Sequence, residues 1–157
     1  MWGKKGKQPR IPTPGGRKRQ PLNGAVDPIH GTVCVAFAKS LKSEAFIEFL
    51  DGLLARNPDK KIVLYTDNAK AHHSKKVKSY LDTCKEVLEI NYLPKYSPDW
   101  NPQEAIWRKF RKAVTHNTFF GSFIEFQRAI VNHFRKVKLP SLEIISLCKY
   151  GKLFNSL

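Results

Sequence analysis

Two carboxylates, Asp67 and Glu104, stand in sequence positions where such side chains can bind a divalent metal ion. Asp67 ends the apolar run at 62–66 ("IVLYTDNAKAHHS"), and Glu104 falls in the first turn of a predicted helix that starts at Asn101. Mg²⁺ takes oxygen ligands, usually one or two carboxylates with waters and substrate phosphates. Two such ions can activate a nucleophile and stabilise the leaving oxygen during attack on a phosphodiester. The pair therefore predicts metal-assisted chemistry on phosphate esters.

Each carboxylate also has a purely structural interpretation. Asp67 can accept a hydrogen bond in an Asx-turn leading out of the strand, and position alone favours neither role. Glu104 completes a variant of the capping box with Asn101 at the N-cap and Pro102 at the first helical position. It also stands four residues before Arg108, a favourable helix pair. Spacing alone favours the structural role for Glu104.

His72 and His73 follow Asp67 closely and could serve as ligands or as a proton shuttle. The better interpretation from position is that they are solvent-exposed or helix-leading histidines in a loop. They are therefore not predicted as metal ligands from the residues alone.

The charge of the chain points to a polyanionic partner. Lys and Arg number 28 against 13 Asp and Glu, for a net charge of +15, which favours nucleic acid, with an anionic membrane surface as the weaker alternative. Aromatic side chains in a loop can stack on bases, whereas Trp107 falls in an apolar helical stripe and is expected in the core. The predicted nucleic-acid contacts are Lys75, Lys76, Tyr96, Trp100, Arg108, Arg111 and Lys112.

Length and composition limit the remaining classes. The 157 residues are about one domain, and no apolar run approaches the roughly 20 residues that span a bilayer. The N-terminus has no apolar core of a signal peptide. The three cysteines, Cys34, Cys84 and Cys148, form no CxxC pair, which argues against a zinc site or a disulfide framework. We expect a reduced, intracellular, soluble protein.

Periodicity predicts the elements that position these side chains. The first elements are a hairpin turning at 27–31 and a helix capped by Ser43 and ended by Asn57-Pro58. A strand at 61–67, a helix capped by Ser74 and a strand at 87–93 follow. The last elements are a helix at 101–114, a helix opened by the capping-box pair Ser122 and Glu125, and a short helix after Pro140. The apolar run at 61–67 is typical of a strand covered on both faces. Residues 1–24 are a basic leader rich in Gly and Pro, and 25–157 are the globular part of one α/β domain.

Two stretches, "YTDNAKAHHSKKVKSYL" and "EINYLPKYSPDWNPQEAIWRKFRK", resemble the catalytic domain of mariner-type and related insertion-sequence transposases. These are DDE superfamily endonucleases with a ribonuclease-H-like, retroviral-integrase-like fold. The family pattern is a strand ending in Asp-Asn, a His shortly after, and "LP-Y-SP-NP-E--W" leading into a basic helix. The matching positions are Asp67, Asn68, His72, Leu93, Pro94, Tyr96, Ser97, Pro98, Asn101, Pro102, Glu104 and Trp107.

The resemblance implies that Asp67 and Glu104 are the second and third carboxylates of a catalytic, metal-binding triad, with Mg²⁺, or alternatively Mn²⁺, as cofactor. Asn68, His72 and Asn101 would support this site. The implied reaction is DNA cleavage and strand transfer during transposition, with excision at terminal repeats and insertion at a short target, commonly TA. The implied partners are double-stranded DNA and further copies of the chain, in a prokaryotic cytoplasm at the nucleoid.

One departure from the family pattern concerns the first Asp of the triad. In the family it lies on the first, central strand, upstream of the segment that here reads Trp2-Gly3. We therefore expect a truncated domain, a mixed sheet flanked by helices that lacks this strand, and no cleavage by the chain alone. Asp27, in a hairpin turn, and Asp51, late in a helix, are poor substitutes. An upstream half carrying the missing Asp and a helix-turn-helix domain would complete the enzyme, unless the chain is a decayed remnant.

Two non-enzymatic interpretations also fit the charge. The first is a basic protein that binds nucleic acid without chemistry, and the second, weaker one is a protein that binds acidic partners. Asp67 and Glu104 discriminate between these and the enzyme, because a pure binder has no use for converging carboxylates. Replacing them by Ala should then leave or improve DNA affinity.

Overall fold

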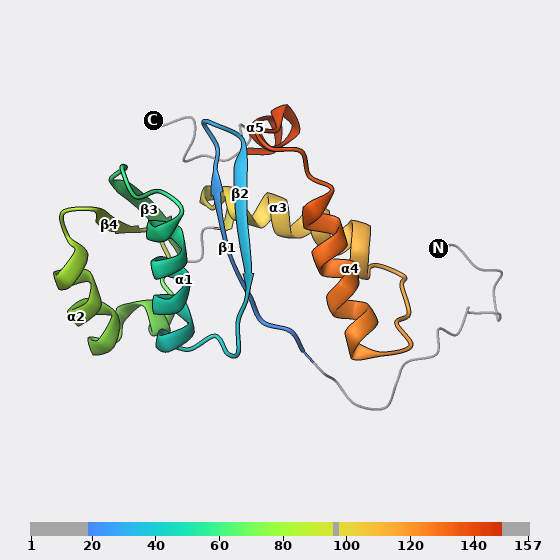
Figure 1. Ribbon diagram of the computed structural model, residues 1–157, viewed down its shortest axis with the longest axis horizontal. Helices are drawn as coiled ribbons and strands as arrows, with labels where there is room; N and C mark the ends of the chain where they lie inside the picture. Colours follow the sequence, from blue (N-terminus) through green and yellow to red (C-terminus); the bar gives the residue numbers. More distant parts are fainter. Residues whose placement is uncertain (1–18, 96–97, 149–157) are drawn as a thin grey trace.

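A computed structural model describes residues 19–95 and 98–148, which form two small sheets and five α-helices of an α/β domain (Figure 1). Most of the expected basic leader lies outside these residues. Strand β1 already begins at Leu22, three residues before the boundary expected at 25. The expected order of strands and helices is confirmed.

The hairpin consists of β1 (Leu22–Asp27) and β2 (Thr32–Phe37), which pair antiparallel with Leu22 opposite Phe37 and Asp27 opposite Thr32. Asp27 holds the turn, because its Oδ1 accepts hydrogen bonds from the amides of Ile29 at 2.9 Å and His30 at 3.0 Å. Gly31 has a φ of 64°, a conformation that glycine adopts at little cost. The hairpin predicted from the sequence is confirmed.

The second sheet is parallel. Strands β3 (Ile62–Thr66) and β4 (Leu88–Tyr92) pair with Ile62 opposite Leu88 and Thr66 opposite Tyr92, and the helix α2 (Lys75–Cys84) forms the crossover that parallel strands require. Ser74 caps α2 as predicted, since its hydroxyl accepts the Val77 amide at 3.3 Å. No backbone pairing joins this sheet to the hairpin within the described ranges.

Helix α1 (Ser43–Ala55) packs against both sheets. Its buried residues Phe46, Phe49, Leu50 and Leu53 form one core cluster with side chains of β1, β2, β3 and β4. The N-cap is Lys42, so the prediction that Ser43 caps α1 is wrong. Ser43 is the first helical residue instead, and its hydroxyl donates to the carbonyl oxygen of Ala71 at 3.0 Å. This bond ties the start of α1 to the segment that follows β3.

Strand β3 is covered on one face only, which corrects the prediction of a strand buried on both faces. Ile62 and Leu64 pack against the α1 cluster. Val63 and Tyr65 point the other way and are 48% and 37% exposed. The continuous apolar run therefore describes a strand whose second face is only partly covered by the described chain.

The C-terminal half is helical. Helix α3 (Pro102–Phe110) continues as a π-helical segment, η3 (Arg111–Thr115), and is followed by α4 (Phe123–Arg135) and α5 (Leu142–Cys148). Phe110, Val114 and Ile130 form a buried cluster against which Trp107, Phe126 and Phe134 pack. The prediction that Trp107 belongs to the core is confirmed, with the ring half-buried against Phe110 and Phe134.

The start of α4 allows a test of the predicted capping box. Ser122 Oγ accepts the Glu125 amide at 3.1 Å, and Glu125 Oε2 accepts the Gly121 amide at 2.9 Å. Because the substitution Ser122→Ala removes one of these bonds, we expect the free energy of unfolding to fall by about 1 kcal/mol. Urea denaturation measures it. Ser79→Ala, on the exposed face of α2, is the control and should change stability by less than about 0.5 kcal/mol; an equal loss in both variants would contradict the capping role.

Candidate functional site

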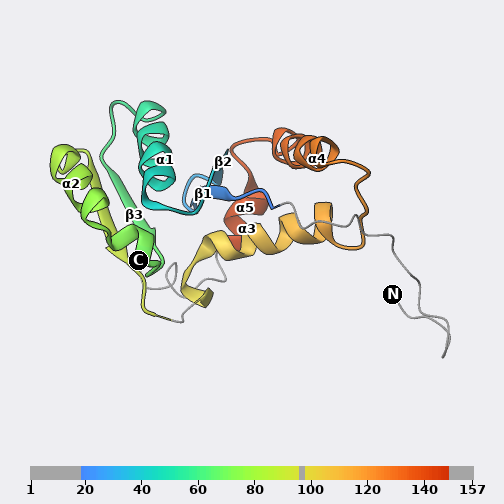
Figure 2. The same ribbon diagram turned by 90° about the horizontal axis from the view of Figure 1, so that it is seen from below.

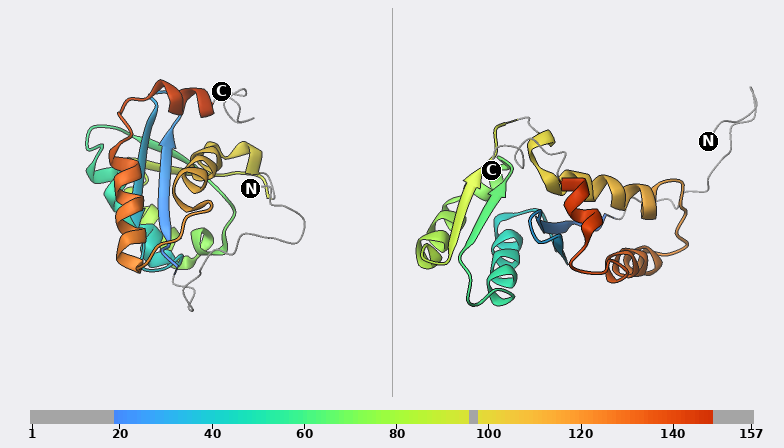
Figure 3. Two further views of the ribbon diagram at one scale, coloured as in Figure 1. Left: turned by 90° about the vertical axis from the view of Figure 1, so that its right-hand side faces the viewer. Right: turned by 90° about the horizontal axis from the view of Figure 1, so that it is seen from above.

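The predicted site residues gather where β3 and β4 end. Parallel strands bring their carboxyl ends to one edge of a sheet, where ligand sites of open α/β sheets form. Figure 2 and the right-hand view of Figure 3 both show the start of α3 near this edge. The side chains contributed here are Asp67, Asn68, His72, Asn101 and Glu104, and we call this group the carboxylate edge.

One carboxylate oxygen of Asp67 accepts hydrogen bonds, and the other has no partner within the described chain. Its Oδ1 accepts the Ala69 amide at 3.1 Å, so the Asx-turn interpretation is correct, and the same oxygen lies 3.1 Å from His72 Nδ1. Within the described chain Oδ2 has no hydrogen-bond partner, and the side chain is 64% exposed. The turn fixes the carboxylate while leaving one oxygen available to a ligand.

His72 holds Asp67 from the interior side. Its side chain is only 18% exposed, so of the two predicted alternatives His72 is not the solvent-exposed one; it lies in the 3-10 turn (Lys70–His73) that leads into α2. The ring lies against the Phe46 ring of α1, with centroids 4.0 Å apart, and Nδ1 is 3.2 Å from Thr66 Oγ1. The Tyr92 hydroxyl donates to the His72 carbonyl oxygen at 3.0 Å. Contacts from α1, β3 and β4 thus fix the ring beside Asp67.

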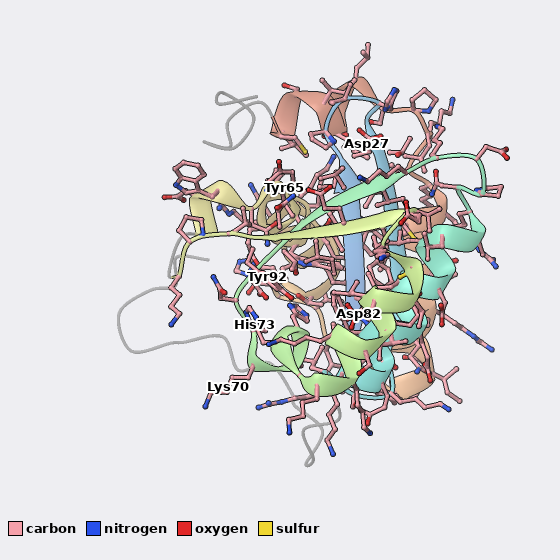
Figure 4. The ribbon with its side chains drawn as sticks, turned by 90° about the vertical axis from the view of Figure 1, so that its left-hand side faces the viewer. Asp27, Tyr65, Lys70, His73, Asp82 and Tyr92 are labelled. Carbon is pink, nitrogen blue, oxygen red and sulfur yellow. The ribbon has the colours of Figure 1, made fainter. Side chains whose placement is uncertain are left out.

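Asn68 joins the ends of the two parallel strands. Its side-chain amide donates to the carbonyl oxygen of Leu93, directly after β4, and its Oδ1 lies 2.9 Å from His73 Nε2. The His73 ring stacks on Tyr92 with centroids 4.0 Å apart. Figure 4 shows His73 next to Tyr92 and Lys70 directed away from the sheet. His73 is exposed, as predicted, and serves the packing of this loop.

Glu104 enters from the first turn of α3. Asn101 is the N-cap, because its Oδ1 accepts the Gln103 amide at 3.1 Å. The prediction that Glu104 pairs with Arg108 is wrong: Glu104 Oε2 lies 3.8 Å from the guanidinium of Arg111 instead. At this distance the pair is loose, so Glu104 remains available to a ligand.

Asp67 follows β3 directly, and Glu104 stands in the first turn of α3. Their side chains share no hydrogen bond, and no group of three His, Cys, Asp or Glu side chains converges on one point in the described chain. Asp27 and Asp51 do not supply a third carboxylate. Asp27 holds the hairpin turn, far from His73 in Figure 4, and Asp51 accepts the Tyr80 hydroxyl at 2.6 Å.

Gln103 is a residue that the sequence interpretation missed. Its side chain is 7% exposed, yet both amide atoms lack a hydrogen-bond partner within the described chain. The amide lies over Gly24 of β1, where an added Cβ would come within 2.8 Å of Nε2. The sequence did indicate its burial, because helical spacing places Gln103 on the apolar face formed by Ile106, Phe110 and Val114. Buried polar groups normally have partners.

The predicted nucleic-acid contacts differ in how free they are. Lys76 is paired with Glu44, and this hydrogen bond lowers the pKa of Glu44. Arg111 is shared with Glu104. Lys75, Arg108 and Lys112 are exposed and have no ion pair within the described chain, whereas Trp100 is half-buried. Tyr96 lies outside the described residues. Among the described helices, none has the length and apolar character needed to cross a bilayer.

Comparison with protein families gives a match over most of the chain. Residues 1–127 match the family described as DDE superfamily endonuclease. A protein of Shigella sonnei, described as an insertion element IS630 uncharacterized 39 kDa protein, is 31% identical over 140 residues. That alignment covers 88% of this chain and 40% of the relative. The chain thus spans less than half the length of this relative.

Comparison with solved structures shows the fold. The Mos1 transposase paired-end complex with the left transposon end matches with a TM-score of 0.70 and 17% identity, covering 99% of this chain and 49% of that chain. The Mos1 transposase catalytic domain with Raltegravir and Mn matches with a TM-score of 0.69 and 18% identity, covering 87% and 72%. The expected ribonuclease-H-like α/β fold is confirmed.

Proposed function

We propose that this chain, which belongs to the DDE superfamily of endonucleases, contributes two of three carboxylates to a transposase that cuts and joins DNA. The observation that carries the proposal is that Asp67 directly follows β3, held beside the fixed ring of His72, while Glu104 stands exposed to ligands in the first turn of α3. The family match includes both carboxylates, since it covers residues 1–127. The similarity to insertion-element and transposase proteins supports DNA as the substrate class.

Asp67 and Glu104 are the proposed ligands of Mg²⁺ or Mn²⁺. Their donor set fits, because Asp67 Oδ2 is unpartnered within the described chain and Glu104 is held only loosely by Arg111. Such ions prefer carboxylate oxygens and complete their shell with water and phosphate. The ion would polarise the scissile phosphate and the attacking oxygen. The solved Mos1 catalytic domain with Mn supports the assignment by analogy.

The remaining residues of the site orient these carboxylates. His72 and the Ala69 amide hold Asp67 Oδ1, which leaves Oδ2 available to an ion. Asn68 keeps the ends of β3 and β4 together, and Asn101 fixes the first turn of α3, on which Glu104 stands. Backbone phosphates would be neutralised by Lys75, Arg108, Arg111 and Lys112, and by Lys76 once its pair with Glu44 opens. Bases would be contacted by Tyr96 and Trp100.

The third carboxylate is proposed to arrive on a strand from outside residues 1–157 that lies between β1 and β3. Two observations support this. The two sheets rest on the same α1 cluster but are not paired with each other. The buried Gln103 amide, beside β1, lacks a partner within the described chain. An added strand would occupy both free edges.

The proposed partners are therefore the transposon ends and target as double-stranded DNA, the segment with the first Asp and a helix-turn-helix domain, and further copies of the chain in the active complex. A protein with this substrate would work at the nucleoid. The competing proposal, a basic protein that binds nucleic acid without chemistry, is favoured only by the net charge of +15.

Completion of the site by the proposed additional strand is the test of the proposed function. Residues 1–157 alone should bind a labelled duplex with an affinity that falls steeply with salt, but should not nick it in Mg²⁺ or Mn²⁺. The same chain joined to the family's first strand with its Asp should nick the duplex. A gel assay of supercoiled plasmid measures both. Nicking by residues 1–157 alone would contradict the need for the strand, and a joined protein that binds without nicking would favour the non-catalytic alternative.

A further inference from the structure

A second candidate site lies away from the carboxylate edge, where α3, the end of α4 and the start of α5 meet. Here a hollow of about 340 Å³ is lined mainly by charged and polar side chains, namely Lys109, His133, Lys136, Lys138, Ser141 and Glu143. Figure 1 shows α4 and the β3–β4 sheet on opposite sides of the hairpin. No residue of the carboxylate edge lines this hollow, and none of the nucleic-acid contacts proposed above does.

The hollow carries more positive than negative charge. Lys109 is paired with Glu143, while Lys136 and Lys138 are exposed and have no ion pair within the described residues. His133 also lines the hollow and is half-buried. Burial, followed by the charge of Lys109, lowers the pKa of His133, so its ring is neutral at neutral pH and can donate one hydrogen bond. Two free ammonium groups beside a concave surface favour an anion.

The shape and chemistry of the hollow select a small anion. A volume of 340 Å³ is at the lower end of ligand pockets. Its apolar lining is Val137, and it holds no Phe, Tyr or Trp ring on which a base could stack. Lys side chains bind phosphate as point charges, and Ser141 and His133 add neutral donors. These features fit one phosphate group and its ester oxygens rather than a whole nucleotide.

We propose that this hollow binds a backbone phosphate of duplex DNA, as a second contact separate from the reacting phosphate. Lys109 stands five residues after Glu104, which places the two side chains roughly 140° apart around α3. The inference rests on the DNA substrate proposed above, and this angle means that the phosphate in the hollow is a different one from the phosphate at Glu104. Such a contact orients the DNA and carries no sequence preference.

The first experiment measures DNA affinity against salt, without divalent ions, so that it does not depend on the carboxylates. Removing one lysine that neutralises a phosphate makes the slope of log affinity against log salt less steep by about 0.9. Lys136→Ala with Lys138→Ala should therefore reduce the slope by about 2. The control is Lys60→Ala with Lys85→Ala, two exposed lysines with the same charge change, which should leave the slope unchanged. Equal changes in both double variants would overturn the proposal.

The second experiment uses inorganic phosphate and the ring signals of His133 in NMR spectra. Phosphate should shift the His133 signals saturably and leave those of exposed His116 unchanged. Glu143→Gln frees Lys109 and removes a negative charge, so it should tighten phosphate binding about fivefold. Unchanged or weaker binding in this variant would overturn the site. A saturable shift combined with an unchanged DNA salt slope would assign the hollow to free phosphate and would overturn the proposed contact with DNA.

Discussion

Asp67→Asn in the protein completed with the missing strand is expected to reduce DNA nicking roughly 10³-fold, because an amide cannot replace a charged metal ligand. The change is nearly isosteric. The amide oxygen can still accept the Ala69 amide hydrogen, so the turn after β3 should persist. The loss is therefore expected in the chemical step while DNA affinity stays level or rises, since one negative charge leaves a basic surface. Single-turnover nicking rates and anisotropy titrations measure the two quantities.

The matched control for this substitution is Asp82→Asn on α2, an exposed aspartate that lies away from the sheet ends (Figure 4). It makes the same change in charge and should leave the nicking rate within about twofold, as a surface change of under about 0.5 kcal/mol implies. Glu104→Gln should behave as Asp67→Asn does. If Asp67→Asn nicked DNA at the original rate, Asp67 would be a turn residue only, and the proposed ligand set would be wrong.

Gly24→Val is expected to lower the free energy of unfolding by about 3 kcal/mol, at the upper end of overpacking effects. An added Cβ at Gly24 would lie 2.6 Å from a ring carbon of Trp107 and 2.8 Å from Gln103 Nε2. Trp107 cannot yield, because its ring packs against Phe110 and Phe134 in the C-terminal core. Helix α3 must therefore move away from β1. Urea or thermal denaturation measures the loss.

The control is Gly52→Ala, at a helical glycine of α1 where an added Cβ meets nothing within 4 Å. Alanine is the better helix former, so this variant should gain up to about 1 kcal/mol. Gly24→Val should also impair nicking by the completed protein at temperatures where it stays folded, because the displaced helix carries Glu104. A fully stable Gly24→Val variant would contradict the tight approach of α3 to β1.

Local signals in the sequence were sufficient for most elements. Ser74 and Ser122 cap the helices that their positions predict, and the turn at Asp27 and Gly31 follows from side-chain chemistry and backbone freedom within five residues. The family motifs led to the match with DDE endonucleases. These features depend on residues close in the chain, where spacing carries the information.

The errors concern contacts between distant residues. Ser43 bonds Ala71 across 28 positions, and His72 is shielded by Phe46 of α1, so neither environment could be read locally. Helix periodicity puts both Arg108 and Arg111 near Glu104, but it does not decide between them, and the pair observed is with Arg111. The apolar run of β3 predicted two covered faces, but on the second face Val63 and Tyr65 are only partly covered by the described chain. The roles of Asp67 and Glu104 as metal ligands stay predictions.

The one-sided burial of β3 bears on how the protein behaves in concentrated solution. An unpaired strand edge beside exposed Val63 and Tyr65 is a template on which other chains can add strands. The net charge of +15 opposes such association through mutual repulsion between molecules. Salt screens that repulsion within about 10 Å at roughly 0.1 M. Rising ionic strength therefore lowers both the solubility of the protein and its affinity for nucleic acid. Buffers with enough salt to dissociate DNA from the protein also promote its aggregation.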